Sequence, residues 1–382
     1  MKRVRNPPNP YASEHHEWLE EPPAALPEVY VERARSILSE NDSPDLHFRW
    51  SVNPYRGCQH ACAYCYARPT HEYLGFGAGT DFETRLIVKE NAPELLRKAF
   101  ASRRWRGELV AFSGVTDCYQ PLEAVWELTR RCLEVCRDFR NPACVVTKSY
   151  LIRRDADLLA EMAARSSMHV CMSIAFAGAE HSRLLEPQAP VPERRFEAMR
   201  ALADAGVPVG VLFAPIIPGL NDSDIPTVLA RAAECGATTA SFVPLRLPGS
   251  VETVFLERLR DVLPLRAERV EHRLREIRGG ALNDCRFGSR MTGQGEYWEA
   301  IDRLFEVSCR RNGLNKPPCV ARPARGDGPG LGAACDGLTG ACNTGLHTDG
   351  AKPSPVPAKT RPSALRYVQL DLPFPSGGLT PR

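Results

Sequence analysis

Short runs of apolar and β-branched residues recur from about residue 46, separated by stretches with the 3.6-residue spacing of amphipathic helices. The apolar runs predict strands at 47–52, 108–112, 143–147, 169–174, 208–215 and 238–247. The intervening pattern predicts helices at 92–102, 122–137, 156–165, 193–205 and 225–234. Such alternation is typical of a parallel sheet covered by helices. The strand number fits a partial barrel or an open doubly wound sheet, and periodicity alone does not separate the two.

The ends of the chain depart from this alternation. The N-terminal part is polar and rich in Pro and Glu, with one helix predicted near 31–38. After the last predicted strand the pattern predicts three further helices, at 251–262, 265–278 and 296–310. The last part is rich in Pro and Gly and poor in large apolar side chains, so we expect it to be disordered. The chain therefore divides into an extension, a barrel, a helical segment and a tail, at 1–44, 45–250, 251–316 and 317–382.

Composition and charge narrow the class of protein. With 43% hydrophobic and 25% charged residues, the chain has the balance of an ordinary globular protein. It contains no run of roughly eighteen apolar residues and begins without a secretion signal, so we predict a cytoplasmic protein with no membrane span. The net charge of +3 arises in the tail, where seven Lys or Arg face four Asp. A neutral body argues against coating nucleic acid through bulk charge.

Three of the 14 cysteines lie together directly after the first predicted strand, in Cys58-Gln-His-Ala-Cys62-Ala-Tyr-Cys65. Soft thiolates this close in sequence can hold one metal centre without distant ligands. Structural zinc would need a fourth ligand. His60 is too tightly placed to serve, although another cysteine could. A four-iron cluster on three thiolates would instead leave one iron open to an external ligand.

The Cys-x3-Cys-x2-Cys spacing, with the aromatic Tyr64 before the last cysteine, resembles the signature of radical S-adenosylmethionine (SAM) enzymes. The resemblance implies a [4Fe-4S] cluster on Cys58, Cys62 and Cys65, whose open iron binds SAM. It implies reductive cleavage of SAM to a 5′-deoxyadenosyl radical and a flavodoxin- or ferredoxin-type electron donor. It also implies an α/β fold, a partial (β/α)6 TIM-type barrel with the cysteine loop at the C-terminal ends of the strands.

In such a barrel, residues just past each strand become candidates for binding SAM. The segment after the second strand contains Ser113, Gly114, Thr116 and Asp117. Gly114 would permit close backbone approach, and Thr116 or Asp117 would accept a hydrogen bond from the ammonium group of SAM. Alternatively, Asp117 caps the helix that follows.

The later strands add further candidates. Lys148 is suited to the SAM carboxylate, although it is also what a solvated strand end carries. Ser173 is a candidate for the ribose, and Arg183 and Glu186 follow it in the next loop. Ile217 lies in an apolar run with a Pro-Gly turn that resembles the family's adenine-packing segment. Arg246, after the sixth strand, is placed to face a substrate.

Within the superfamily, Thr116-Asp-Cys-Tyr-Gln-Pro121 and Ala214-Pro-Ile-Ile-Pro-Gly-Leu-Asn-Asp222 resemble the spore photoproduct lyase-related group. Its understood members reverse a thymine dimer in DNA with a cysteine hydrogen donor near strand two. This chain has Ser113 there, with Cys118 displaced beyond Asp117, which argues against that particular repair. We expect a lyase-like enzyme acting on nucleic acid in a repair-related role. The alternatives are modification of protein or RNA, or a non-enzymatic metal-stabilised adaptor.

The tail carries one apolar peptide, Gln369-Leu-Asp-Leu-Pro-Phe374. It is similar to short peptides that bind the bacterial DNA sliding clamp, in which a glutamine and apolar side chains dock in a groove. The hypothesis is that this peptide recruits the protein to replication or repair assemblies. The alternative is a strand or arm that folds back onto the protein's own core.

Overall fold

The computed structural model describes residues 4–15, 25–46, 48–315 and 366–368. Most of the predicted tail, including the peptide 369–374, lies outside these residues. The larger sheet has the strand order β10-β9-β8-β7-β6-β3-β2, in which β3 to β10 are parallel and β2 is antiparallel. Its strands are β2 (Leu38–Glu40), β3 (Trp50–Val52), β6 (Val110–Phe112), β7 (Ala143–Thr147), β8 (Met168–Ser173), β9 (Val209–Ile216) and β10 (Thr239–Pro244). The six parallel strands form the partial barrel that the sequence predicts.

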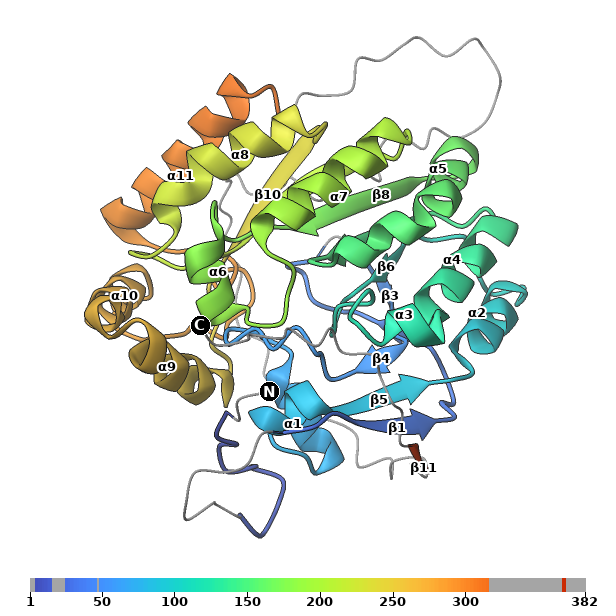
Figure 1. Ribbon diagram of the computed structural model, residues 1–382, viewed down its shortest axis with the longest axis horizontal. Coiled ribbons are helices and arrows are strands. Elements are labelled where there is room, and N and C mark those ends of the chain that lie inside the picture. Colours follow the sequence, from blue (N-terminus) through green and yellow to red (C-terminus); the bar gives the residue numbers. More distant parts are fainter. Residues whose placement is uncertain (1–3, 16–24, 47, 316–365, 369–382) are drawn as a thin grey trace, which may run out of the picture.

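Helices cover the outer face of this sheet, which explains why β6 is buried throughout and β7 almost throughout (Figure 1). They are α2 (Ala92–Phe100), α3 (Glu123–Trp126), α4 (Leu128–Asp138), α5 (Ala156–Arg165), α6 (Ala179–Leu185), α7 (Pro192–Asp204) and α8 (Ile225–Glu234). The single helix predicted at 122–137 is wrong in one respect. Glu127 has a φ of 50° and divides it, and the Glu123 carboxylate accepts hydrogen bonds from the Thr129 and Arg130 amides at the start of α4.

The barrel is open between its first and last strands. The second edge of β3 is occupied by β2. At β10, the Asn315 side chain accepts a hydrogen bond from the Ala240 amide and donates one to the Ala240 carbonyl, both at 2.8 Å. Its own amide donates to the Thr238 carbonyl at 2.9 Å. Asn315 therefore pairs with backbone groups of Thr238 and Ala240 to which a further strand would otherwise form hydrogen bonds.

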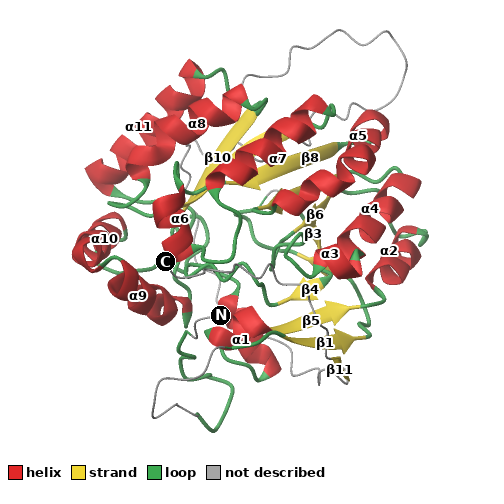
Figure 2. Cartoon of the chain, viewed as in Figure 1, coloured by secondary structure: helices red, strands yellow, loops and turns green. Residues whose placement is uncertain are grey.

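A second sheet, of order β11-β1-β5-β4, lies below the larger sheet in Figure 2, and its strand β4 leads directly into the cysteine loop. It contains β1 (Glu28–Glu32), β4 (Tyr55–Arg56), β5 (Arg85–Lys89) and β11 (Arg366–Val368), with η1 (Arg68–Leu74) and α1 (Thr80–Thr84) between β4 and β5. The helix predicted near 31–38 is wrong, because β1 alternates buried and half-exposed residues with the period of a strand. In the tail, β11 pairs antiparallel with β1, so the chain folds back at residues 366–368.

The helices α9 (Val251–Val262), α10 (Pro264–Ile277) and α11 (Gly295–Arg311) follow β10 and close that side of the barrel. Two short helices lie elsewhere: η2 (Tyr150–Asp155) follows β7 and packs on α5 and α7, and η3 (Asp222–Asp224) precedes α8. Phe305 and Trp298 of α11 pack on Phe242 of β10, with ring centroids 4.6 and 5.9 Å apart. Residues 279–294, here called the bridging loop, connect α10 to α11. Within the described part of the chain, no helix has the length and apolar character needed to cross a membrane.

Candidate active site

The cysteine loop begins with a backbone conformation that favours glycine. Gly57 has a φ of 75°, and a Cβ at this position would lie 2.9 Å from the Phe82 carbonyl oxygen. The next amide, of Cys58, donates to that same carbonyl at 2.9 Å. Cys58 and Cys62 are buried, and Cys65 is half-buried. The turn therefore carries the three thiols inward from the end of β4.

Arg68 fastens the loop from the side of the second sheet. Its Nε and Nη2 donate to the Cys62 carbonyl at 3.1 and 2.9 Å, and Nη2 also donates to Glu83 Oε1 at 2.6 Å. Both side chains are buried, so their charges compensate each other where water does not reach. Sequence reasoning missed this pair, because Arg68 and Glu83 look like ordinary surface residues of two short helices.

Gln120 fastens the same loop from the barrel side. Its Oε1 accepts from the Gln59 amide and its Nε2 donates to the Gly57 carbonyl, both at 3.0 Å. Gln120 is fully buried. The backbone around Cys58 is thus held on both sides, and the only sequence signal for Gln120 was its place in the segment after the second barrel strand.

The three thiols lie near enough to influence one another's ionisation. Burial is the main cause that raises the pKa of Cys58 well above its usual range, and the neighbouring Cys65 and Cys62 add to it. Burial likewise raises the pKa of Cys62 to about 12. Thiolates here need a cationic centre to stabilise them. Among the described residues, no three His, Cys, Asp or Glu side chains converge as a single metal ion requires.

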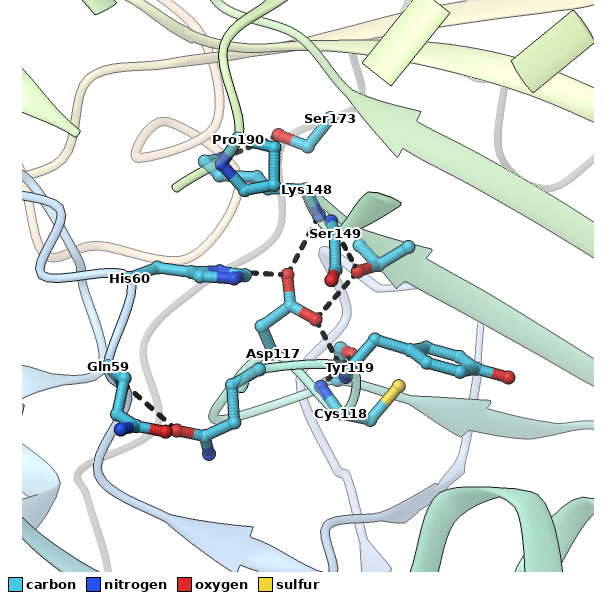
Figure 3. A network of polar contacts seen from close by, with 12 residues as sticks. Gln59, His60, Asp117, Cys118, Tyr119, Lys148, Ser149, Ser173 and Pro190 are labelled. Atoms are coloured by element: carbon cyan, nitrogen blue, oxygen red, sulfur yellow. Dashed lines mark hydrogen bonds and ion pairs between the residues drawn. The ribbon is translucent and has the colours of Figure 1, made fainter. Parts of the chain in front are cut away.

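Asp117 joins the cysteine loop to the ends of β6 and β7 (Figure 3). Its Oδ1 accepts from Thr147 Oγ1 at 2.7 Å and the Tyr119 amide at 2.9 Å. Its Oδ2 accepts from the Lys148 amide at 2.8 Å and lies 3.3 Å from His60 Nδ1. Burial opposes its ionisation, yet His60 and the hydrogen-bond donors lower the pKa of Asp117 to about 2. The carboxylate is a junction between three segments of this chain.

The rest of the segment after β6 lies against β3 and the cysteine loop. Ser113 has a φ of 77°, and its Oγ accepts from the amide of the buried Cys118 at 3.0 Å. A Cβ on Gly114 would lie 3.3 Å from that of Ser51, so the backbone passes close to β3. Thr116 Oγ1 donates to the Tyr55 carbonyl at 3.1 Å.

Lys148 reaches across the strand ends toward β8. Its Nζ donates to Ser173 Oγ at 2.7 Å and lies 3.7 Å from Glu186 Oε1. It also lies 5.7 Å from the centre of the Tyr64 ring. The side chain is 14% exposed, so the structure does not leave it in open solvent.

Glu186 is the second carboxylate of the site. It is buried, and it contacts the cysteine loop through Tyr64. It accepts hydrogen bonds from the Tyr64 hydroxyl, from Ser182 Oγ at 3.0 Å and from Arg195. Burial opposes its ionisation, yet Arg195 and Lys148 lower the pKa of Glu186 to about 2. The sequence analysis named Glu186 as a candidate in the loop after β8, but it missed Arg195 altogether.

Two further candidates lie apart from this polar group. Ile217 is buried in an apolar cluster that includes Cys62 and Tyr64, and its amide donates to Asn221 Oδ1 at 2.6 Å. Arg183 is exposed on α6, away from the carboxylate of Glu186.

Comparison with known proteins identifies the class to which this barrel and loop belong. The family model described as the radical SAM superfamily matches residues 52–232. An uncharacterized protein of Mycobacterium tuberculosis is 39% identical over 213 residues, 55% of this chain and 63% of that protein. An uncharacterized protein of Methanocaldococcus jannaschii is 33% identical over 195 residues, 51% of this chain and 70% of that protein. The chain belongs to the radical SAM superfamily, and it spans less than two thirds of the length of the mycobacterial relative.

Two solved structures of spore photoproduct lyase variants share the fold. One has a TM-score of 0.54 at 15% identity and covers 75% of this chain and 80% of its own. The other holds AdoMet and a dinucleoside spore photoproduct, and has a TM-score of 0.52 at 17% identity, covering 74% and 77%. At this level of identity the likeness concerns the fold alone.

Proposed function

We propose that the chain is a radical SAM enzyme in which Cys58, Cys62 and Cys65 hold a [4Fe-4S] cluster. The observation that carries this proposal is the inward-facing thiol trio, on a loop fastened from both sides and placed at the ends of the barrel strands. Such a cluster, once reduced, supplies the electron that cleaves SAM to a 5′-deoxyadenosyl radical. A flavodoxin- or ferredoxin-type protein of the cytoplasm is the proposed electron donor.

The donor set fits this cluster better than a zinc ion. Each thiolate of a [4Fe-4S] cluster binds a different iron, so the three sulfur atoms surround the cluster instead of meeting at one point. Both amide atoms of the buried Gln59 lack a hydrogen-bond partner in the described part of the chain. A bound group beside this loop would satisfy them.

The strand ends supply the proposed SAM site. Lys148 and Ser173 present an ammonium and a hydroxyl to the carboxylate and ribose, and Tyr64 and Ile217 supply apolar surface beside Cys62. In the segment after β6, Ser113, Gly114, Thr116 and Asp117 form the wall nearest β3. Because Asp117 already accepts hydrogen bonds from donors of the protein, its proposed role is to hold this wall in place.

The loaded protein tests the proposal directly. Anaerobic reconstitution with iron and sulfide should yield a protein that forms 5′-deoxyadenosine from SAM after reduction. Cys58→Ala should reduce that yield to background, while Cys136→Ala, at a buried cysteine of α4, should leave it within about twofold. A protein that binds only zinc, or full activity in Cys58→Ala, would contradict the proposal. A non-enzymatic adaptor would contain no iron and sulfide.

For the substrate we propose nucleic acid. The support is the fold shared with spore photoproduct lyase, one of whose structures holds a dinucleoside photoproduct. Deuterium transfer into 5′-deoxyadenosine from labelled DNA, RNA and protein would separate the three polymers. Transfer from protein alone would overturn this choice without affecting the proposed cluster chemistry.

Recruitment by the tail is a separate proposal. The peptide 369–374 follows β11, whose backbone pairs with β1. Binding of the isolated peptide to a bacterial sliding clamp tests it, and no binding at high micromolar concentration would overturn it.

A further inference from the structure

The end of β10 leads to an arginine that forms no ion pair with any described carboxylate. Arg246 is half-buried, and its Nε is fully buried without a hydrogen-bond partner in the described part of the chain. Its guanidinium donates to Met291 Sδ at 3.7 Å, which is a weak acceptor. No described carboxylate forms an ion pair with it. The other arginines that lie inside the fold have carboxylates or several carbonyls as partners: Arg68, Arg195, Arg278 and Arg290.

The backbone on both sides of Arg246 is held in place. The Leu245 carbonyl accepts from Arg278 Nη2 at 3.3 Å, and the Leu247 amide donates to Asn283 Oδ1 at 3.0 Å. Both partners come from the end of α10 and the bridging loop. The arginine is therefore presented on a fixed support, which lowers the entropy lost when it binds a ligand.

The bridging loop is itself anchored to the opposite edge of the open sheet. Arg290 donates from Nε to Asp45 Oδ2 at 2.5 Å and from Nη2 to Ser43 Oγ at 2.6 Å. The Gly288 amide donates to Asp45 Oδ1 at 2.7 Å. Asp45 is therefore engaged by the bridging loop, and it does not form an ion pair with Arg246.

Arg246 also lies beside the cysteine loop. Burial lowers the pKa of Arg246, the neighbouring Arg290 lowers it further, and Tyr66, Asp45 and Cys285 act in the opposite direction. Tyr66 directly follows the third cysteine, is 50% exposed, and donates to the Gly114 carbonyl at 2.9 Å. Arg246 thus lies near Tyr66 and contacts the bridging loop through Met291, at the end of the barrel where substrates bind.

We infer that Arg246 binds an oxyanion of the substrate, a phosphate or a carboxylate, at the mouth of the barrel. A guanidinium suits this task because its planar fork donates two parallel hydrogen bonds to either group. The inference rests on the proposed function only in taking this end of the barrel as the substrate side. It concerns binding and can be tested without radical chemistry.

Thermal unfolding of the anaerobically reconstituted protein, titrated with phosphate or succinate at constant ionic strength, measures the effect. A ligand at about ten times its Kd should raise Tm by roughly 2–4 °C. Arg246→Met should lose this rise, yet melt no lower than wild type without the anion, because it removes an uncompensated charge. Arg246→Lys should weaken binding about tenfold, since it keeps the charge and loses the fork. The anion that binds more tightly shows whether the substrate's oxyanion is a phosphate or a carboxylate.

The control is Arg286→Gln, which removes a positive charge from the same bridging loop at a side chain that is 78% exposed. It should keep the anion-dependent rise. No rise in wild type, an unchanged rise in Arg246→Met, or equal loss in Arg286→Gln would overturn the inference. A large loss of SAM affinity in Arg246→Met would also overturn it, by assigning the arginine to the cofactor. Anion binding without 5′-deoxyadenosine formation would instead contradict only the proposed function.

Discussion

Two carboxylates, Asp117 and Glu186, contact the cysteine loop at different residues, His60 and Tyr64, and each is held ionised by different means. Asp117 receives neutral donors from the ends of β6 and β7, and His60 lies beside it without a cation as strong as a buried arginine. Glu186 is paired with Arg195, which is fully buried, and with Lys148. One region is organised by hydrogen bonds to the backbone and the other by compensation of full charges.

The difference indicates how each region should respond to a change. Backbone donors can turn partly to water when Asp117 is altered, because its side chain is 9% exposed. Water cannot replace the partner of Arg195 in this way, because neither Arg195 nor Glu186 has exposed side-chain surface. Loss of the negative charge should therefore lower the free energy of unfolding more at Glu186 than at Asp117.

Glu186→Gln should produce the largest effect. It leaves the buried Arg195 without a counter-charge, and we expect the free energy of unfolding to fall by roughly 3–5 kcal/mol. Urea unfolding measures this loss. The control Glu197→Gln breaks an exposed ion pair with Arg194 and should change stability by less than about 0.5 kcal/mol. Equal effects in the two variants would show that Arg195 finds another partner.

His71 extends the comparison to a buried group that forms no ion pair with any described residue. Its Nε2 contacts the Arg85 carbonyl, and burial lowers the pKa of His71 to about 4. Because the unfolded value is about 6.5, the unfolded chain binds more protons between these pH values. Stability should therefore fall by up to roughly 3 kcal/mol as pH falls from about 6.5 to about 4.

When the free energy of unfolding, measured with urea, is plotted against pH over this range, its slope should be smaller for His71→Gln than for wild type. His272→Gln, at an exposed histidine of α10, should retain the wild-type slope. The same slope in His71→Gln and wild type would show that other groups cause the acid sensitivity.

Asp117→Asn should have an intermediate effect. The amide keeps the shape but replaces one acceptor oxygen with a donor that faces the Lys148 amide or Thr147, so we expect a loss of roughly 1–3 kcal/mol. Asp204→Asn on the exposed face of α7 is the matched control. A loss as large as that of Glu186→Gln would remove the distinction between the two regions.

Lys148→Met should have the smallest effect on stability, roughly 0.5–1 kcal/mol, because Glu186 keeps Arg195, Tyr64 and Ser182. Its affinity for SAM, measured by calorimetry on the reconstituted protein, should fall about tenfold if the ammonium binds the cofactor. Lys98→Met, at an exposed lysine of α2, should change neither quantity. Unchanged SAM affinity in Lys148→Met would limit this lysine to a structural link between the two regions.

Local pattern was sufficient to predict most of the barrel. The helices α5, α8 and α9 have the predicted ends, and β7 matches its predicted range. The second sheet was missed, because β4 has two residues and β5 lies among short helical turns. β4 is too short to show a period, and the strands of this sheet are stabilised by pairing with segments distant in the sequence.

The candidate site divides in the same way. The cysteine trio and the strand-end residues are adjacent in sequence to features that the pattern shows, so their position could be predicted. Arg68 and Arg195 could not be found in this way. Their roles depend on which carboxylate and which carbonyls the path of the chain brings to them. In a sequence, a charged residue within a helix otherwise indicates a solvent-exposed face.

By itself the sequence determined the alternation of strands and helices and the loop that carries the thiols, because both are local properties of composition and spacing. Only the tertiary structure decided that the barrel stays open at Asn315, that Glu186 meets Arg195, and that Arg246 forms no ion pair with a described carboxylate. The physical reason is that burial removes water as a partner for every polar group. Which group replaces it depends on the path of the whole chain.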